Sequence, residues 1–264
     1  MTPQNKANKK VFMKILKLLL VFLMISCAMD RPSGSSEAEV LYKEAIAFKN
    51  DGHYLAAVEK LNQIRSKHPY SYFATHAELL NADILFIQEN YVEAAAAYLL
   101  FKNVHPKYDN LPYVVFKIAE SYYFQLPSTF DRDLSGADEA IKYYKEVIDN
   151  YPSSAFVTDA QDKIKECYGL LAKKEQYIAD FYYKTGEYSA ARYRYLEILK
   201  QSGIEFSLRE HSMINIVKSS WFLKEFETCI EQGRDFVENL TESNKKKMNN
   251  LIKNCEKKKM ETKT

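Results

Sequence analysis

The sequence contains few residues that interrupt helices, and it lacks the short motifs that mark catalytic sites. Its 264 residues include only seven glycines and seven prolines. Alanine, leucine, lysine, glutamate, tyrosine and phenylalanine dominate, which favours helices over strands or disorder. There is no glycine-rich phosphate loop, His-Glu-x-x-His, Gly-x-Ser-x-Gly or Cys-x-x-Cys motif. These absences argue against an enzyme. The alternative is an enzyme acting on peptidoglycan through a site that no short motif marks, which turnover of purified sacculi would reveal.

Histidine and cysteine are also too sparse and scattered to predict a metal or cofactor site. His68 and His105 each precede a proline, so helix ends explain them better than metal binding. Cys167, Cys229 and Cys255 lie far apart and show no metal-ligand spacing. We therefore expect no cofactor and no metal. For these cysteines we expect buried or unpaired thiols, with a Cys229–Cys255 disulfide as the alternative outside the cytoplasm.

The first 26 residues have the pattern of a bacterial lipoprotein signal. A lysine-rich start is followed by an apolar stretch, residues 18–25, that is too short to span a bilayer. Residues 23–27 resemble a lipobox, with Met24 in place of the usual leucine and Cys27 as the acyl acceptor. We expect removal of residues 1–26 and a lipid anchor on Cys27 outside the cytoplasm. An uncleaved signal anchor or an incidental thiol is the alternative.

The residues after Cys27 predict where the protein is anchored and how. In enteric-type lipoproteins an aspartate directly after the lipidated cysteine favours retention at the inner membrane. Here that position is Ala28, so by analogy we expect the outer membrane. Residues 27–39 include Pro32, Gly34 and three serines, which predicts a flexible tether.

The charge balance excludes one class of partner and singles out the C-terminus. Five of the 37 basic residues belong to the signal, which leaves 32 basic against 35 acidic residues. This balance gives no support for a nucleic-acid partner. We expect residues 241–264 to form a solvated basic tail, a frayed helix or coil. The alternative is contact with an acidic partner or anionic lipid. Its lysines are Lys245, Lys246, Lys247, Lys253, Lys257, Lys258, Lys259 and Lys263.

An internal repeat predicts the fold. Tyr54 is followed three residues later by Ala57, and Ala57 is followed twelve residues later by Pro69. Both spacings recur 37 residues further along the chain. Each repeated alanine begins an apolar i, i+4, i+7 stripe, which is one face of a helix. This is the tetratricopeptide pattern. It predicts an all-α, right-handed superhelical solenoid of about five tetratricopeptide-like helix pairs, whose concave groove suits an extended peptide or a partner domain. The repeated position is occupied by Ala57, Ala94, Ala140 and Ala191, and in a weaker copy by Cys229.

Two departures from the repeat period predict the domain organisation. Surplus residues at 126–133 indicate a loop within the third repeat, where Asp-Arg-Asp is expected to cap the next helix. About fourteen further residues lengthen the helix expected from Asp159 to Tyr183. We therefore assign residues 40–152 to N-terminal repeats one to three and residues 153–240 to C-terminal repeats four and five. The boundary lies near Pro152, with the two halves rigidly coupled.

After the signal, the whole chain resembles the BamD family, the lipoprotein subunits of the outer-membrane β-barrel assembly machinery. The lipobox, the five repeats and the length agree. The usual Tyr-Pro of the fourth repeat is missing, and Gly203 stands at its place. The most specific stretch of the resemblance consists of residues 130–133, Ala140, residues 151–154, residues 178–182, residues 186–191 and Arg194.

The resemblance implies a function without a chemical step. The protein would help to recognise, fold and insert outer-membrane barrels together with BamA and other lipoproteins of the machinery. The C-terminal repeats of the family dock the BamA POTRA domain closest to its barrel. Arg194 occupies the position of an arginine that contributes to this docking, and a guanidinium suits a bidentate carboxylate contact. The alternative is that Arg194, like nearby Arg192, is simply an exposed arginine on a helix.

The resemblance also implies a groove for substrates in the N-terminal repeats, which in the family recognise the C-terminal strand of barrel proteins. These strands end in an aromatic residue, so apolar pockets with polar rims would suit them. We expect the groove at Tyr72, Phe73, Tyr113 and Phe116, although most aromatic residues here must belong to the core. The competing function is a tetratricopeptide lipoprotein that serves another envelope machine, as a secretin pilot or a pilus-assembly factor.

Overall fold

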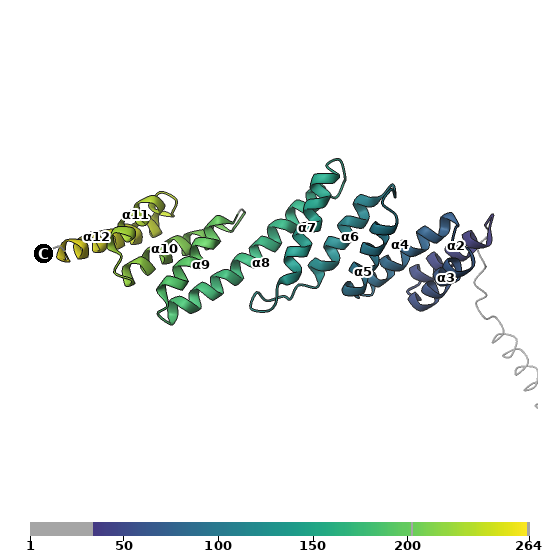
Figure 1. Cartoon of the computed structure of the whole chain (residues 1–264), viewed down its shortest axis with the longest axis horizontal. Coiled ribbons are helices and arrows are strands. Elements are labelled where there is room, and N and C mark those ends of the chain that lie inside the picture. Colours follow the sequence, from purple (N-terminus) through teal and green to yellow (C-terminus); the bar gives the residue numbers. More distant parts are fainter. Residues whose placement is uncertain (1–33, 202, 263–264) are drawn as a thin grey trace, which may run out of the picture. The chain divides into compact units, whose positions relative to one another are not determined.

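The structure is a computed structural model that describes residues 34–201 and 203–262. The signal, the lipidation residue Cys27 and most of the predicted tether lie outside the described residues. The described residues form eleven helices and no strand, and none of these helices is both long and apolar enough to span a membrane. Numbered as in Figure 1, they are α2 (Glu37–Asn50), α3 (Tyr54–Lys67), α4 (Tyr72–Ile87), α5 (Tyr91–Val104), α6 (Leu111–Phe124), α7 (Ser135–Asn150), α8 (Val157–Lys184), α9 (Tyr188–Lys200), α10 (Phe206–Phe222), α11 (Phe226–Val237) and α12 (Glu242–Glu261).

The described residues divide into two compact units, one that ends at Ala77 and one that begins at Glu78. The division falls within α4. The boundary near Pro152 between N-terminal and C-terminal repeats stays a prediction. In the first unit α2 packs on α3. Helix α2 begins at Glu37, inside the segment predicted as a tether, because the Ser36 hydroxyl accepts a hydrogen bond from the Glu39 amide at 3.2 Å and so caps the helix.

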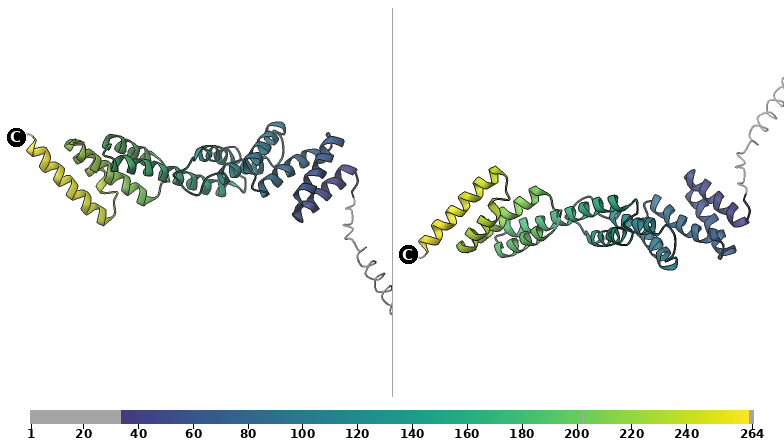
Figure 2. Two further views of the ribbon diagram at one scale, coloured as in Figure 1. Left: turned by 90° about the horizontal axis from the view of Figure 1, so that it is seen from below. Right: turned by 90° about the horizontal axis from the view of Figure 1, so that it is seen from above.

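In the second unit each helix packs on the next, and the apolar core continues from one pair to another. One cluster of buried residues extends from α4 to α8, a second from α8 to α10, and a third from α10 to α12. Helix α8 lies between α7 and α9 (Figures 1 and 2). It has 28 residues and belongs to the first two clusters, because Cys167 is buried in one and Ala179 in the other. This helix confirms the long helix predicted from Asp159 to Tyr183.

The repeated small residues lie where the helices of each pair meet. Ala57, Ala94, Ala140 and Ala191 are all fully buried, as close approach between two helices requires. The repeat prolines follow the last residues of α3, α5 and α7, where their missing N–H costs no helical hydrogen bond. The prediction of an all-α fold of tetratricopeptide-type helix pairs is confirmed.

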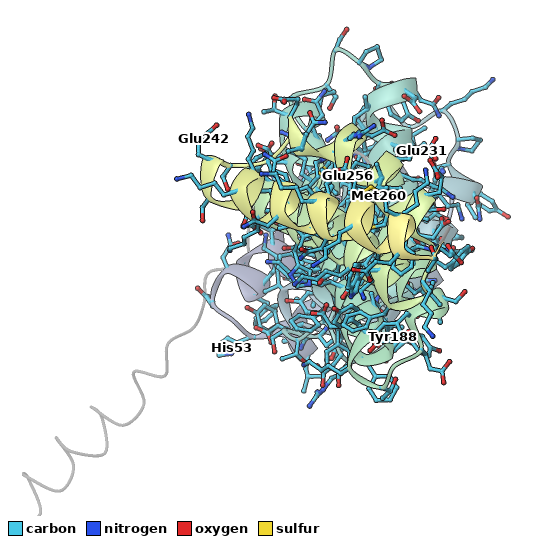
Figure 3. All side chains as sticks on the ribbon, turned by 90° about the vertical axis from the view of Figure 1, so that its left-hand side faces the viewer. His53, Tyr188, Glu231, Glu242, Glu256 and Met260 are labelled. Atoms are coloured by element: carbon cyan, nitrogen blue, oxygen red, sulfur yellow. A yellow bond between two sulfur atoms is a disulfide. The ribbon has the colours of Figure 1, made fainter. Side chains whose placement is uncertain are left out.

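The prediction of a frayed or coiled basic tail is wrong for most of the segment. Residues 242–261 form α12, which packs on α11 and α10. Its buried residues Met248, Ile252 and Cys255 are spaced four and three apart, so they form one apolar stripe of a helix. In Figure 3, α12 crosses the front of the view between Glu242 and Met260, both labelled.

Helix α12 is attached to α11 by a disulfide and by close packing. Cys229 and Cys255 form a disulfide with their Cα atoms 6.3 Å apart, so our expectation of unpaired thiols was wrong for these two. Cys167 is the buried free thiol. At Gly233 an added Cβ would lie 2.6 Å from Cγ1 of Ile252. Only glycine therefore lets the two helices approach this closely.

Candidate protein-binding surfaces

Arg194 is on α9, and its side chain forms one ion pair, with Glu175. Its Nη1 atom lies 3.0 Å from Oε2 of Glu175 on α8, and 38% of the side chain is exposed. An ion pair this exposed contributes little stability. Its guanidinium has five N–H donors, and the described structure pairs one of its nitrogens with a carboxylate. Arg194 can therefore exchange this contact for one with another protein.

Arg192, two residues earlier on α9, is more tightly fixed. Its Nη1 atom donates hydrogen bonds to the Ser220 hydroxyl at 3.1 Å and to the Glu225 carboxylate. Ser220 is buried, and the Arg192 side chain is only 20% exposed. The two arginines thus differ, because Arg192 joins α9 to α10 and α11 whereas Arg194 presents its charge to solvent.

The four residues of the predicted substrate groove belong to two different units, Tyr72 and Phe73 to the first and Tyr113 and Phe116 to the second. Phe116 is buried and stacks on Phe156 with ring centroids 4.8 Å apart. Tyr113 is half-buried and donates a hydrogen bond to Asp83 Oδ1 at 2.7 Å. Periodicity did not show that both face the core of the second unit. The assignment of Phe116 to a groove is therefore corrected, because a side chain enclosed in this way supports the fold.

Tyr72 and Phe73 lie in the first unit, at the start of α4, among other rings. The exposed fraction of Tyr72 is 72%. Its ring centroid is 4.1 Å from that of His76, and the Phe73 centroid is 5.6 Å from that of Tyr42. This cluster presents aromatic surface to solvent with imidazole and hydroxyl groups beside it. It can accept an apolar side chain and also form polar contacts.

Two partly buried carboxylates in the second unit, Asp83 and Asp180, hold equivalent positions. Asp83 Oδ1 accepts hydrogen bonds from the hydroxyls of Tyr98 at 2.6 Å and Tyr113 at 2.7 Å. Burial, with a further contribution from the Asp83 charge, raises the pKa of both tyrosines. Asp180 repeats this arrangement 97 residues later, accepting from the Tyr195 hydroxyl and lying 2.8 Å from Nε2 of His211.

Three aromatic rings of α4, the start of α5 and the end of α6 recur 97 or 98 residues later in the chain. Phe86 and Tyr91 have centroids 5.3 Å apart, and Tyr91 stacks on Phe124 at 5.2 Å. Their counterparts Tyr183, Tyr188 and Phe222 give 5.5 Å and 4.5 Å. Helices α4 to α6 and α8 to α10 are therefore two copies of one packing arrangement. Sequence reasoning missed both aspartates, although each stands eleven residues before a repeated alanine.

The described residues include no cluster of histidine, cysteine or carboxylate side chains that could hold a metal ion. His68 and His105 lie at the ends of α3 and α5, as predicted. Asp133 accepts hydrogen bonds from the amide and the hydroxyl of Ser135 at 3.0 and 2.9 Å, so it caps the start of α7. The surfaces described above are suited to binding other proteins.

Comparison with known proteins places this helical-repeat protein in a family. The model of the outer membrane lipoprotein family YfiO matches residues 35–211. The chain belongs to this family, which includes the outer membrane protein assembly factors named BamD. It is similar to BamD of Rickettsia prowazekii, with 31% identity over 194 residues that cover 71% of this chain and 77% of the relative. BamD of Neisseria gonorrhoeae is 27% identical over 203 residues, covering 70% and 76%.

Solved structures of repeat proteins resemble the chain more distantly. The TPR2AB domain of yeast Sti1, in a complex with pHSP90, matches with a TM-score of 0.41 and 14% identity, covering 84% of this chain and all of that chain. A tetratricopeptide repeat protein from Parabacteroides merdae matches with a TM-score of 0.36 and 12% identity, covering 84% and 88%.

Proposed function

We propose that the protein is a non-catalytic subunit of the outer-membrane β-barrel assembly machinery. The family match over residues 35–211 is the observation that carries this proposal. The protein would be tethered to the outer membrane by lipid on Cys27 and face the periplasm. Its partners would be a BamA POTRA domain, the other lipoproteins of the machinery and the C-terminal strands of unfolded barrel proteins. A stack of helix pairs suits this role because it presents extended binding surfaces.

We assign the docking of BamA to the C-terminal repeats around Arg194. The exposure of Arg194 and its single contact with Glu175 support this assignment. A carboxylate of the partner would replace Glu175, or share the guanidinium with it, in a charge-assisted hydrogen bond. Arg192 would take no direct part, because its guanidinium already joins three helices of its own chain.

Arg194→Glu is expected to weaken binding of the BamA periplasmic domain at least about thirtyfold. Reversing one charge of a hydrogen-bonded interface pair costs about 2 kcal/mol or more. Titration of the purified chain with that domain, followed by calorimetry, measures the effect. Arg65→Glu, on the exposed surface of α3 in the first unit, is the matched charge-reversal control and should leave the affinity unchanged.

Two further outcomes of this titration test the assignment. Glu175→Gln should retain or tighten binding, because it releases Arg194 from its internal partner without changing Arg194 itself. If Arg194→Glu binds as tightly as the unaltered chain while both melt at the same temperature, the docking residue lies elsewhere. If the unaltered chain does not bind BamA at all, the assembly function itself is contradicted.

We assign recognition of substrate strands to Tyr72 and Phe73, with Tyr113 and Phe116 supporting the fold. Tyr72→Ala should weaken binding of a peptide that ends in an aromatic residue by about tenfold, because an aromatic side chain at the centre of a contact contributes about 1 to 2 kcal/mol. Fluorescence anisotropy with a labelled barrel C-terminal peptide measures this. Tyr70→Ala is the control, since Tyr70 is fully exposed. Equal losses for both variants would argue against a specific pocket at Tyr72.

A further inference from the structure

The two copies of the packing arrangement in the second unit differ beside α6 and α10, the third helix of each copy. Next to α6, the ring of Phe156 stacks on Phe116 with centroids 4.8 Å apart and lies 6.0 Å from that of Tyr113. Phe156 is the residue directly before α8. An internal aromatic side chain of the same protein therefore fills the space between α6 and the start of α8.

The corresponding space beside α10 is open. The counterparts of Phe116 and Tyr113, 98 residues later, are Ile214 and His211, and the residue directly before α12 is Thr241. No aromatic ring is available from this position. Instead the structure has a cavity of about 420 Å³ between α10 and α12, lined in part by Ile214 and His211. This α10–α12 cavity is the empty counterpart of the space that Phe156 fills, and its volume is in the range of ligand sites.

The polar lining of the cavity differs from its filled counterpart in charge. On α6, Lys117 and Glu120 form an ion pair at 2.7 Å. Their counterparts on α10 are Asn215, which is buried, and Lys218, which is exposed. Within the described residues no carboxylate forms an ion pair with Lys218. At this place α10 therefore carries a cation that is not neutralised.

Helix α12 is also less acidic beside the cavity than α8 is at the corresponding positions. Asn244 and Lys247 line the cavity, and they stand at the places that Asp159 and Asp162 occupy in α8, counted from the residue before each helix. The Lys247 ammonium donates a hydrogen bond to Asn244 Oδ1 at 3.1 Å. Two acidic positions of α8 thus correspond to an amide and an ammonium group on α12.

Glu210 is the one acidic residue in the lining, and its charge is already compensated. Its carboxylate accepts hydrogen bonds from the Thr241 amide and, at 3.1 Å, from the Asn244 side chain. Burial alone would raise the pKa of Glu210, but these hydrogen bonds, with a smaller contribution from the charge of Lys247, lower it overall. Glu210 is therefore a fixed anion at one side of the cavity, and Lys218 remains available to a ligand.

We propose that the α10–α12 cavity binds an aromatic side chain from an internal segment of a partner polypeptide, with an aspartate or glutamate a few residues away. The ring lies on Ile214, as Phe156 lies on Phe116, and the carboxylate lies between Lys218 and Lys247. The protein's own segment shows this chemistry, because Phe156 comes from a connection within the chain and is followed by Asp159 and Asp162. The proposal does not depend on the assembly function.

The test uses the full chain and a peptide with the sequence of residues 151–162, acetylated and amidated so that its only carboxylates are internal. Calorimetry should show saturable binding with one site. Replacing the phenylalanine of the peptide by alanine, or both of its aspartates by asparagine, should weaken binding about tenfold or more. Lys218→Glu and Lys247→Glu in the chain should have similar effects. Lys246→Glu, an exposed neighbour on α12 outside the cavity lining, should stay within about twofold.

Thr241→Phe keeps the test decisive if the charge reversals disturb the fold. It supplies from within the chain the aromatic ring that Phe156 supplies beside α6, so it should abolish peptide binding without lowering the melting temperature. Binding that survives Thr241→Phe would overturn the proposal, as would no binding at millimolar peptide. A peptide that binds only with a free aromatic C-terminal residue, and not in the blocked form, would also overturn it, because the occupant would then be a chain end.

Discussion

Replacing Asp83 by alanine is expected to lower the free energy of unfolding by about 3 kcal/mol. Asp83 accepts hydrogen bonds from Tyr98 and Tyr113, and Tyr98 is fully buried. Without the carboxylate, the hydroxyls of Tyr98 and Tyr113 have only each other as partners, so one of the two donors is left inside the protein without an acceptor. Each unsatisfied group costs about 1 to 3 kcal/mol. Urea unfolding followed by circular dichroism measures the loss.

Three companion variants test this explanation for Asp83. Asp83→Asn retains an acceptor oxygen and should lose about 1 kcal/mol. Tyr98→Phe combined with Asp83→Ala should recover part of the loss, because it removes the fully buried one of the two hydroxyls. Asp180→Ala should cost less than Asp83→Ala, since its partner His211 is 38% exposed and can bond to water. Equal stability of Asp83→Ala and Asp83→Asn would contradict the account.

Loss of the Cys229–Cys255 disulfide is expected to cost about 3 kcal/mol of stability. The disulfide joins residues 26 apart in the sequence, and in the chain-entropy description a loop of this length gives an effect of that size. Cys229→Ala with Cys255→Ala should therefore shift the urea midpoint strongly and expose the amides of α12 to hydrogen exchange. The remaining attachment of α12 rests on Met248, Ile252 and the close approach at Gly233.

The control for the disulfide is the third buried cysteine. Cys167→Ala removes a fully buried sulfur that forms no disulfide, so it should cost only about 1 kcal/mol, and this loss relative to the unaltered chain should be the same with and without reductant. A thiol assay on the unfolded, unreduced chain lacking residues 1–27 should detect one free thiol. Three free thiols, or a midpoint that reductant does not change, would contradict the paired state of Cys229 and Cys255.

The repeat could be predicted from the sequence because close packing of helix backbones requires a small residue at a regular spacing. Where two helices approach closely, only small side chains fit, so Ala57, Ala94, Ala140 and Ala191 record the position of each pair. The length of α8 followed from the same spacing, because surplus residues between repeat prolines and alanines must extend an element. These features depend on residue size and period, which a single sequence displays directly.

The parts that sequence reasoning missed depend on which side chains meet across helices. Only three residues of α12, Met248, Ile252 and Cys255, are buried, and the lysines around them concealed this stripe. The two copies within the second unit share contacts more than identities, since His211 replaces Tyr113 and Tyr183 replaces Phe86. Periodicity likewise placed Phe116 on a helix without showing which neighbour covers it.

Affinity purification of the full-length protein from its native membrane, followed by mass spectrometry, identifies the machine in which the protein works. We expect BamA among the leading partners, with recovery reduced for Arg194→Glu and unchanged for Arg65→Glu. Recovery of a secretin or a pilus component in place of BamA would rule out the proposed assembly function and would assign the protein to another envelope machine.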